Sequence, residues 1–302
     1  MEHKKIQPNM SVNAGPKPFA KPSVKTGTPG APTSWGGVAD WYDGLLGEED
    51  TYQKEVILPN LLRLMAPNAG MHVLDLACGQ GFFSRAIAAT GAKVTGVDIS
   101  PELIEIARSK SPVSKSGVPS FAVSPADHLP RVDGATFDAV LISLAIQNIE
   151  NLQGTFDECA RVLKPEGKLF VVMNHPAFRV PKRSGWGWDD AAKSQYRRVD
   201  AYLSESKEEI VMNPGKEAAK VAATAFAGKE VAAKEGSAKT VSFHRPLQLY
   251  FKKLQKAGFA VSRLEEWNSH KESQPGPRGA EENRIRKEIP MFLCLEGVKV
   301  VK

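Results

Sequence analysis

Residues 73–81 read VLDLACGQG, and the interpretation of the whole chain starts from this stretch. Val73–Leu76 has the length and apolar character of a short buried strand, and a turn containing Gly79 and Gly81 follows it. Glycine lets backbone amides approach a ligand closely, so a turn of this kind between a strand and a helix is suited to nucleotide-like cofactors. An acid, Asp75, lies inside the strand just before the turn.

The composition excludes several classes of protein. The 302 residues are 42% hydrophobic, but no apolar run approaches the roughly 20 residues of a membrane-spanning helix. No zinc-protease, paired-cysteine or P-loop motif occurs, so no metal is expected. The cysteines are odd in number and scattered, which favours a reducing cytoplasm over a disulfide framework; they are Cys78, Cys159 and Cys294.

The net charge of +6 is distributed unevenly. Residues 1–32 carry five lysines and one acid, and their Pro, Gly and Ser content predicts a disordered basic tail. The remaining residues carry 35 basic and 33 acidic side chains, so the body is nearly neutral. Nucleic acid is therefore an unlikely partner, while the oligomeric state stays open.

Strands and helices alternate through the first half of the chain. Helices are expected over Phe82–Thr90, from Ser100 to about Ser109, and over Thr155–Leu163, with Ser100 and Pro101 as a strong start signal. This alternation predicts an α/β fold with a doubly wound parallel sheet. Its expected strands are Val73–Leu76, Val94–Val97, Phe121–Val123, Phe137–Ser143 and Lys168–Met173.

The alternation stops after the fifth strand. Residues 174–245 show no clear strand, and 214–240 are rich in Ala and Lys. A helix is expected over Leu247–Ala257. Two late strands, Phe259–Trp267 and Ile289–Val300, are separated by a charged loop at 268–288.

Two cofactor classes are compatible with a glycine turn followed by an acid, Asp98, at the end of the second strand. A nicotinamide dinucleotide needs a third glycine, but Ser84 occupies that position. Asp75 would repel a pyrophosphate and attract the amine of an amino-acid cofactor, as in S-adenosylmethionine. An NAD-linked oxidoreductase is the weaker alternative.

Five motifs in order and spacing carry a resemblance: VLDLACGQG, VTGVDIS, SPADHLP, FDAVLISLAIQNI and LKPEGKLFVV. Over about residues 70–175 the chain resembles a class I S-adenosylmethionine-dependent methyltransferase, similar to the branch that includes the ubiquinone/menaquinone C-methyltransferases. The resemblance implies methyl transfer to a small organic acceptor. An RNA or protein methyltransferase of the same fold is the alternative.

The resemblance also implies an architecture. Residues 33–302 would form one Rossmann-like domain with a mostly parallel seven-stranded sheet and an antiparallel last strand. A lid insertion (176–245) would follow the fifth strand, and the 268–288 loop would lie over the active face.

Carried over residue by residue, the resemblance assigns the cofactor site. Asp75 and the turn would line the methionine part, Asp98 would bind the ribose, and Ile99 would lie against the adenine. Asp127 would accept from the adenine amine beside Ala126, and Ser143 and Leu144 would lie near the sulfonium. The turn residues are Ala77, where relatives more often have glycine, Cys78, expected to pack rather than react, Gly79 and Gly81.

Candidates for the acceptor side come from the position of residues after the strands. His175 directly follows the fifth strand and is the candidate catalytic residue, as a base or a positioning group. Aromatic and basic side chains suit a planar or anionic acceptor. The substrate-binding candidates are Tyr42, Trp186, Tyr196, Arg197 and His270.

Overall fold

The computed structural model describes residues 49–111, 117–211 and 239–301, together with Trp35, Ala39, Asp43 and Gly44. The predicted basic tail and the candidate Tyr42 lie outside the described residues, as does nearly all of the Ala/Lys-rich stretch.

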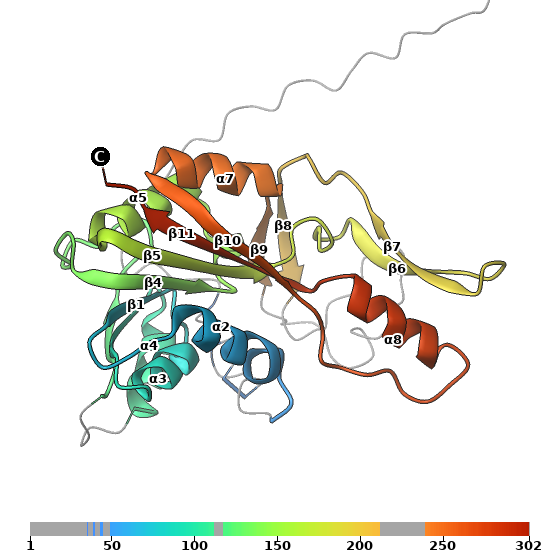
Figure 1. Cartoon of the computed structure of the whole chain (residues 1–302), viewed down its shortest axis with the longest axis horizontal. Helices are drawn as coiled ribbons and strands as arrows, with labels where there is room; N and C mark the ends of the chain where they lie inside the picture. Colours follow the sequence, from blue (N-terminus) through green and yellow to red (C-terminus); the bar gives the residue numbers. More distant parts are fainter. Residues whose placement is uncertain are drawn as a thin grey trace, which may run out of the picture.

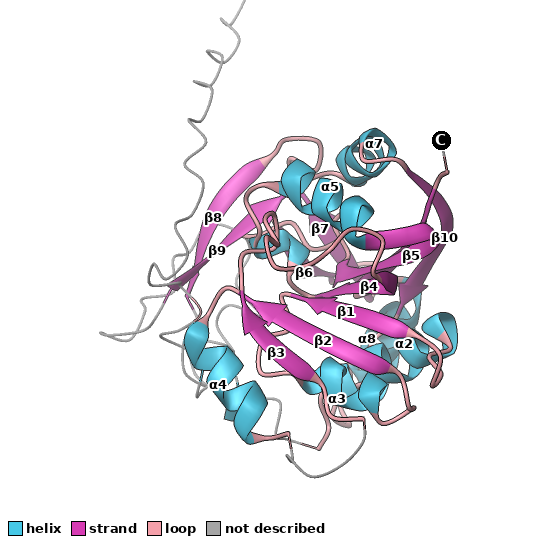
Figure 2. Ribbon diagram, turned by 90° about the vertical axis from the view of Figure 1, so that its left-hand side faces the viewer, coloured by secondary structure: helices cyan, strands magenta, loops and turns pink. Residues whose placement is uncertain are grey.

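A seven-stranded sheet forms the centre of the molecule (Figure 2), in the order β10-β11-β5-β4-β1-β2-β3. All neighbouring strands pair in parallel except β11, which is antiparallel to both β5 and β10. The predicted doubly wound sheet and its antiparallel last strand are therefore confirmed. The strands are β1 (His72–Leu76), β2 (Lys93–Asp98), β3 (Ser120–Val123), β4 (Phe137–Ser143), β5 (Leu163–Asn174), β10 (Phe259–Trp267) and β11 (Phe292–Lys299).

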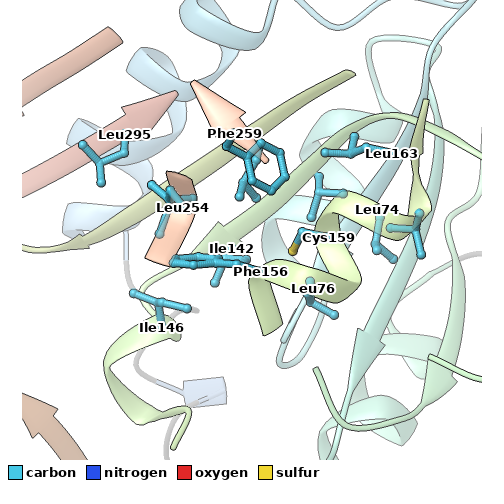
Figure 3. Close-up of a cluster of buried hydrophobic side chains, with 14 of the residues drawn as sticks. Leu74, Leu76, Ile142, Ile146, Phe156, Cys159, Leu163, Leu254, Phe259 and Leu295 are labelled. Atoms are coloured by element: carbon cyan, nitrogen blue, oxygen red, sulfur yellow. The ribbon is translucent and has the colours of Figure 1, made fainter. Parts of the chain in front are cut away.

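Helices cover both faces of the sheet. On one face, α5 (Leu152–Val162) and α7 (Leu247–Lys256) bury Phe156, Cys159 and Leu254 against the strands (Figure 3). On the other face, the π-helical turn η2 (Gln53–Ile57), α2 (Leu58–Met65) and α3 (Phe82–Ala88) form a second core cluster. Alternate residues of β1 and β4 enter the two clusters, which is why both strands read as nearly continuous apolar runs.

Local signals fix most helix starts. The Ser100 hydroxyl accepts a hydrogen bond from the Leu103 N–H, so α4 (Pro101–Ser109) begins where the sequence predicted. Asn151 caps α5 by accepting from the Gly154 N–H, so this helix begins three residues before the predicted Thr155. β5 begins at Leu163, before the predicted Lys168, and its first part is irregular, with a φ of 63° at Glu166.

The prediction of no strands over 174–245 is wrong. Two antiparallel hairpins lie there: β6 (Ser184–Asp189) with β7 (Ser194–Val199), and β8 (Ser206–Val211) with β9 (Lys239–His244). Glycines and charged residues interrupt the apolar alternation by which a strand is recognised, so the sequence pattern is weak. In Figure 1, β6 and β7 extend to one side of the main sheet.

The predicted 268–288 loop is also partly wrong, because it contains helix α8 (Gly279–Glu288). Ile285 is the only buried residue of this helix, so it has almost no apolar periodicity. The side chain of Glu281 accepts a hydrogen bond from the Gln195 N–H, which ties α8 to β7. None of the helices in the described ranges is long and apolar enough to cross a membrane.

Candidate active site

The candidate site lies at the edge of the sheet where the parallel strands end, the usual ligand-binding edge of an open α/β sheet. The β1 turn, Asp98 and Ser143 all lie at this edge. The segments after β5 and β10 start there too, because the His175 N–H donates to the Met291 carbonyl and the Met291 N–H donates to that of Trp267. In Figure 1, α8 lies near the β6–β7 hairpin beyond this edge.

The glycine turn is held in left-handed backbone conformations. The φ angles of Ala77, Gly79 and Gly81 are 59°, 55° and 77°. Ala77 is strained there, because an L side chain disfavours this region. A Cβ atom on Gly81 would lie 2.8 Å from the ring of Phe121, so packing of β3 requires this glycine independently of any ligand.

Asp98 ties the turn to the end of β2. One carboxylate oxygen accepts from the Gly79 N–H at 2.8 Å and the other from the Ser100 N–H at 2.9 Å. Burial raises its pKa, and these backbone hydrogen bonds oppose the rise. A carboxylate has about four acceptor positions, so capacity for two further donors, such as the hydroxyls of a ribose, remains.

Asp75 is 1% exposed, and no cationic side chain of the described residues is bonded to it. The Ser84 hydroxyl donates to its carboxylate at 2.5 Å. Burial raises the pKa of Asp75 to about 7, the Ser84 hydrogen bond opposes this, and the negative charge of Asp98 adds to it. A buried acid of this kind favours a cationic ligand group, because a positive charge would offset the cost of its ionisation.

A second acid lies at the predicted adenine side. One carboxylate oxygen of Asp127 accepts from the side-chain amide of Asn151 at 2.7 Å, which fixes its orientation. The other oxygen accepts no hydrogen bond from the described residues. Ala126 packs partly against the core, and Ile99 is partly buried between Asp98 and Ser100.

Unused polar atoms gather at the end of β4. The Ser143 hydroxyl and the side-chain carbonyl of Gln147 are buried without a hydrogen-bond partner in the described structure. Between them, Leu144 has a φ of 53°, a strained value for leucine. Buried polar atoms normally find partners, so these two are free to bond a ligand.

The position of Cys78 fits the packing role expected for it. Its thiol is buried, burial raises its pKa well above the usual value, and it points toward the Gly79 carbonyl at 3.6 Å. All three cysteines are free and buried.

His175 is 3% exposed, and both its ring nitrogens are engaged. The Ala177 N–H donates to Nδ1, so Nε2 carries the proton and donates to Glu266 at 2.7 Å. Burial lowers the pKa of His175. This geometry fits a neutral positioning histidine, and its catalytic role stays a prediction.

The β6–β7 hairpin places its substrate-binding candidates on opposite faces. Trp186 and Arg197 pair across the strands on one face, where the guanidinium carbon lies 5.0 Å from the indole centroid. Arg278, at the start of α8, stacks on Trp188 of the same face at 4.5 Å. Tyr196 lies on the opposite face over Gly187 and is 42% exposed, so the hairpin does not bring it together with Arg197.

His270 belongs to a contact between the segment before η2 and the segment after β10. Its Nε2 bonds Asp50 at 2.6 Å, and its ring packs edge-on against Tyr52 at 5.2 Å. Tyr52 also bonds Ser269. The Nδ1 of His270 is buried without a partner in the described structure, so it is free to form a hydrogen bond with the molecule that receives the methyl group.

Comparison with known proteins adds to this geometry. Residues 74–171 match the model of a methyltransferase domain. The fold matches a solved S-adenosylmethionine-dependent methyltransferase from Mesorhizobium loti with a TM-score of 0.57 and 25% identity, over 79% of this chain and 96% of that one. Residues 74–171 thus have the sequence pattern of a methyltransferase domain, and they lie within a fold similar to that of an S-adenosylmethionine-dependent methyltransferase.

The methyltransferase domain also resembles two curated proteins. It is 39% identical over 115 residues to demethylmenaquinone methyltransferase of Tropheryma whipplei, covering 38% of this chain and 46% of that protein. It is 31% identical over 132 residues to ubiquinone biosynthesis O-methyltransferase of Xylella fastidiosa, covering 43% and 53%. The chain thus spans about half the length of these relatives.

The residues at the edge of the methyltransferase domain fit the cofactor of its class. Asp75 suits the amine, Asp98 the ribose and the open oxygen of Asp127 the adenine amine. The unpartnered Ser143 hydroxyl lies on the side expected for the sulfonium. Each is a chemical match between a ligand group and an atom that has bonding capacity left.

Three further residues of the domain were missed at the sequence level. Ser84 occupies the position of the third glycine of a dinucleotide motif, and at the sequence level it indicated only that this glycine is missing. In the structure its hydroxyl donates a hydrogen bond to Asp75. Asn151 has the residue type of a helix N-cap, a signal that was available. Arg179, in the helical turn after β5, has no side-chain partner among the described residues, and no motif in the sequence marked it.

Proposed function

We propose that this chain transfers a methyl group from S-adenosylmethionine to a small aromatic acceptor of the quinone-precursor type. The observation that carries the proposal is the pair of buried acids, Asp75 and Asp98, on either side of the strained glycine turn. The acceptor class is supported by the names of the curated relatives, a demethylmenaquinone methyltransferase and a ubiquinone biosynthesis O-methyltransferase.

In this proposal, the bound cofactor supplies a methyl group on a sulfonium, which is already activated for displacement. The protein therefore orients two molecules and excludes water. Asp75 holds the amine directly or through water, and Asp98 holds the ribose. Ile99 and Ala126 contact the adenine, whose amine donates to Asp127, while Ser143 and Leu144 border the sulfonium.

The acceptor would lie between this edge and the β6–β7 hairpin. Trp186 offers a planar surface and Arg197 a cation beside it. His270 offers its buried Nδ1 atom as a hydrogen-bonding partner for this molecule. In this proposal the hairpins and the segment with α8 act as a cover over the active face.

Calorimetry with S-adenosylhomocysteine, and with NAD as the comparison ligand, tests the cofactor. We expect heat of binding with the first and none with the second. No binding of S-adenosylhomocysteine would overturn the proposal.

A labelled-methyl assay tests the acceptor. The probes are a dihydroxynaphthoic acid and a dihydroxybenzoic acid, with the product identified by mass, and we expect methylation of at least one of them. Methylation of RNA or protein fractions, with neither probe reacting, would favour the alternative class of acceptor.

We also propose that the enzyme is cytoplasmic and that its acceptor is not a nucleic acid. The three unpaired cysteines and the nearly neutral body support these two statements. Salt-dependent RNA binding by the chain without residues 1–32 would contradict the second.

A further inference from the structure

Two neighbouring arginines at the active edge lack acidic partners. Arg179 lies in the helical turn after β5, where its N–H donates to the His175 carbonyl, and its guanidinium makes no hydrogen bond or ion pair within the described structure. Arg197 donates from Nε to the Phe178 carbonyl at 2.8 Å and from Nη2 to the Ser184 hydroxyl at 2.9 Å. Neither partner of Arg197 is charged.

The surroundings of the two guanidinium groups are unfavourable for positive charge. Burial lowers the pKa of Arg179, and the hydroxyl of Tyr52 opposes this. Burial lowers the pKa of Arg197 to about 10, and the charge of Arg179 adds to the effect. Two like charges in a partly buried site destabilise the free protein unless an anion joins them.

Other arginines of the chain, whose role is structural, bond either to acidic side chains or to backbone carbonyls. Arg161 pairs with Glu158 and Arg284 with Glu281. Arg245, which is 6% exposed, donates to the backbone carbonyls of Ile146, Ile149 and Glu150. Among the described residues Arg179 has neither kind of partner, so its guanidinium donors are available to a ligand.

The shape of the site indicates which anion it takes. A guanidinium is planar and matches a carboxylate through two parallel hydrogen bonds. The indole of Trp186 lies against Arg197 and offers a flat apolar face next to it. A planar acid therefore fits better than an isolated phosphate.

We propose that Arg179 and Arg197 bind the carboxylate of an aromatic acid, which is the acceptor of the methyl group. This inference rests on the proposed function and narrows its substrate class. The carboxylate would lie between the turn after β5 and the β6–β7 hairpin, with the ring against Trp186.

The test uses the full chain saturated with S-adenosylhomocysteine, with benzoate and inorganic phosphate as probes. We expect benzoate to bind and to raise the melting temperature, and phosphate to bind more weakly. R179Q and R197Q should each weaken benzoate binding by about tenfold or more, because a hydrogen-bonded charge is lost. R198Q is the matched control, since Arg198 lies on the opposite face of β7 and should leave binding unchanged.

Stability separates ligand binding from a structural role. If Arg179 serves a ligand, R179Q should melt at the same or a higher temperature than the parent, because a buried unpaired charge is removed. A lower melting temperature with intact benzoate binding would overturn the inference. Tighter binding of phosphate than of benzoate would overturn the assignment of a carboxylate.

The same titrations separate this inference from the function on which it rests. If the parent chain fails to bind S-adenosylhomocysteine, the proposed function fails. If it binds S-adenosylhomocysteine but R179Q and R197Q bind benzoate like the parent, only the present inference fails.

Discussion

The carboxylate of Asp98, at the end of β2, accepts a 2.8 Å hydrogen bond from the backbone N–H of Gly79, in the turn after β1. Its second oxygen accepts from the Ser100 N–H at the start of α4. One side chain thus holds together the two motifs that the sequence shows as separate signals. Asp98 is therefore expected to order the site as well as to bind the ribose.

Replacing Asp98 with alanine should weaken binding of S-adenosylhomocysteine by about 10–100-fold, because hydrogen bonds to a charged group are lost. D98N should also weaken it, since an amide cannot accept from both the Gly79 and Ser100 N–H groups in the same way. Calorimetry measures both. D133A, which removes an exposed acid away from the turn, is the control, and an equal loss in that variant would contradict this assignment.

Binding of S-adenosylhomocysteine should strengthen as the pH rises from 6 to 8. Asp75 has a pKa of about 7 in the free folded protein, above its usual 3.8, with Asp98 and Arg85 as the charges that act on it. Between these two pKa values the folded state keeps a proton on Asp75 that the unfolded chain has lost. The contribution of this proton to the free energy of unfolding is lost as the pH rises through about 7. The cationic amine binds the ionised form, so the affinity should change by up to about tenfold per pH unit below the pKa.

D75N provides the control for this pH dependence. It should bind S-adenosylhomocysteine weakly and with little change between pH 6 and 8. A variant that keeps the slope of the parent would show that another group titrates.

Replacing Ala77 with glycine should stabilise the protein by about 1 kcal/mol, because the left-handed conformation of Ala77 is strained for an L residue. Urea unfolding measures the change. A89G is the matched control, since Ala89 has a φ of −62° and the substitution there should destabilise by about 0.5–1 kcal/mol. A loss of stability in A77G would show that another interaction holds Ala77 in place.

H175Q should lower the free energy of unfolding by about 1–3 kcal/mol, because Glu266 and the Ala177 N–H lose a buried partner. We expect kcat to stay within about tenfold of the parent. Thermal unfolding and a pH profile of kcat check both statements. A loss of about 100-fold or more in kcat at an unchanged melting temperature would establish His175 as the general base.

Strands and helices were predicted correctly where their pattern lies within their own residues, and were missed where their stability depends on distant segments. The strand Phe137–Ser143 has the predicted bounds, because a strand buried on both faces has a strong apolar pattern. Phe259–Trp267 also has the predicted bounds, although only its two end residues are buried. The hairpin β6–β7 and helix α8 were missed, because they pack mainly against each other and through few apolar residues. Their stability comes from tertiary contacts rather than from their own pattern.

The sequence by itself determined the sheet, its glycine turn and the class of cofactor, because these depend on residues close together in the chain: Asp75 before the turn, Ser100 at a helix start and five motifs in register. Only the tertiary structure decided that Asp98 holds Gly79 and that His175 has both nitrogens engaged. It also decided that Arg179 and Arg197 lie near each other with no acidic partner among the described residues. Each of these depends on which groups from distant segments share one volume. Whether a charged side chain has a partner depends on which groups surround it in three dimensions, and the order of the residues alone does not show this.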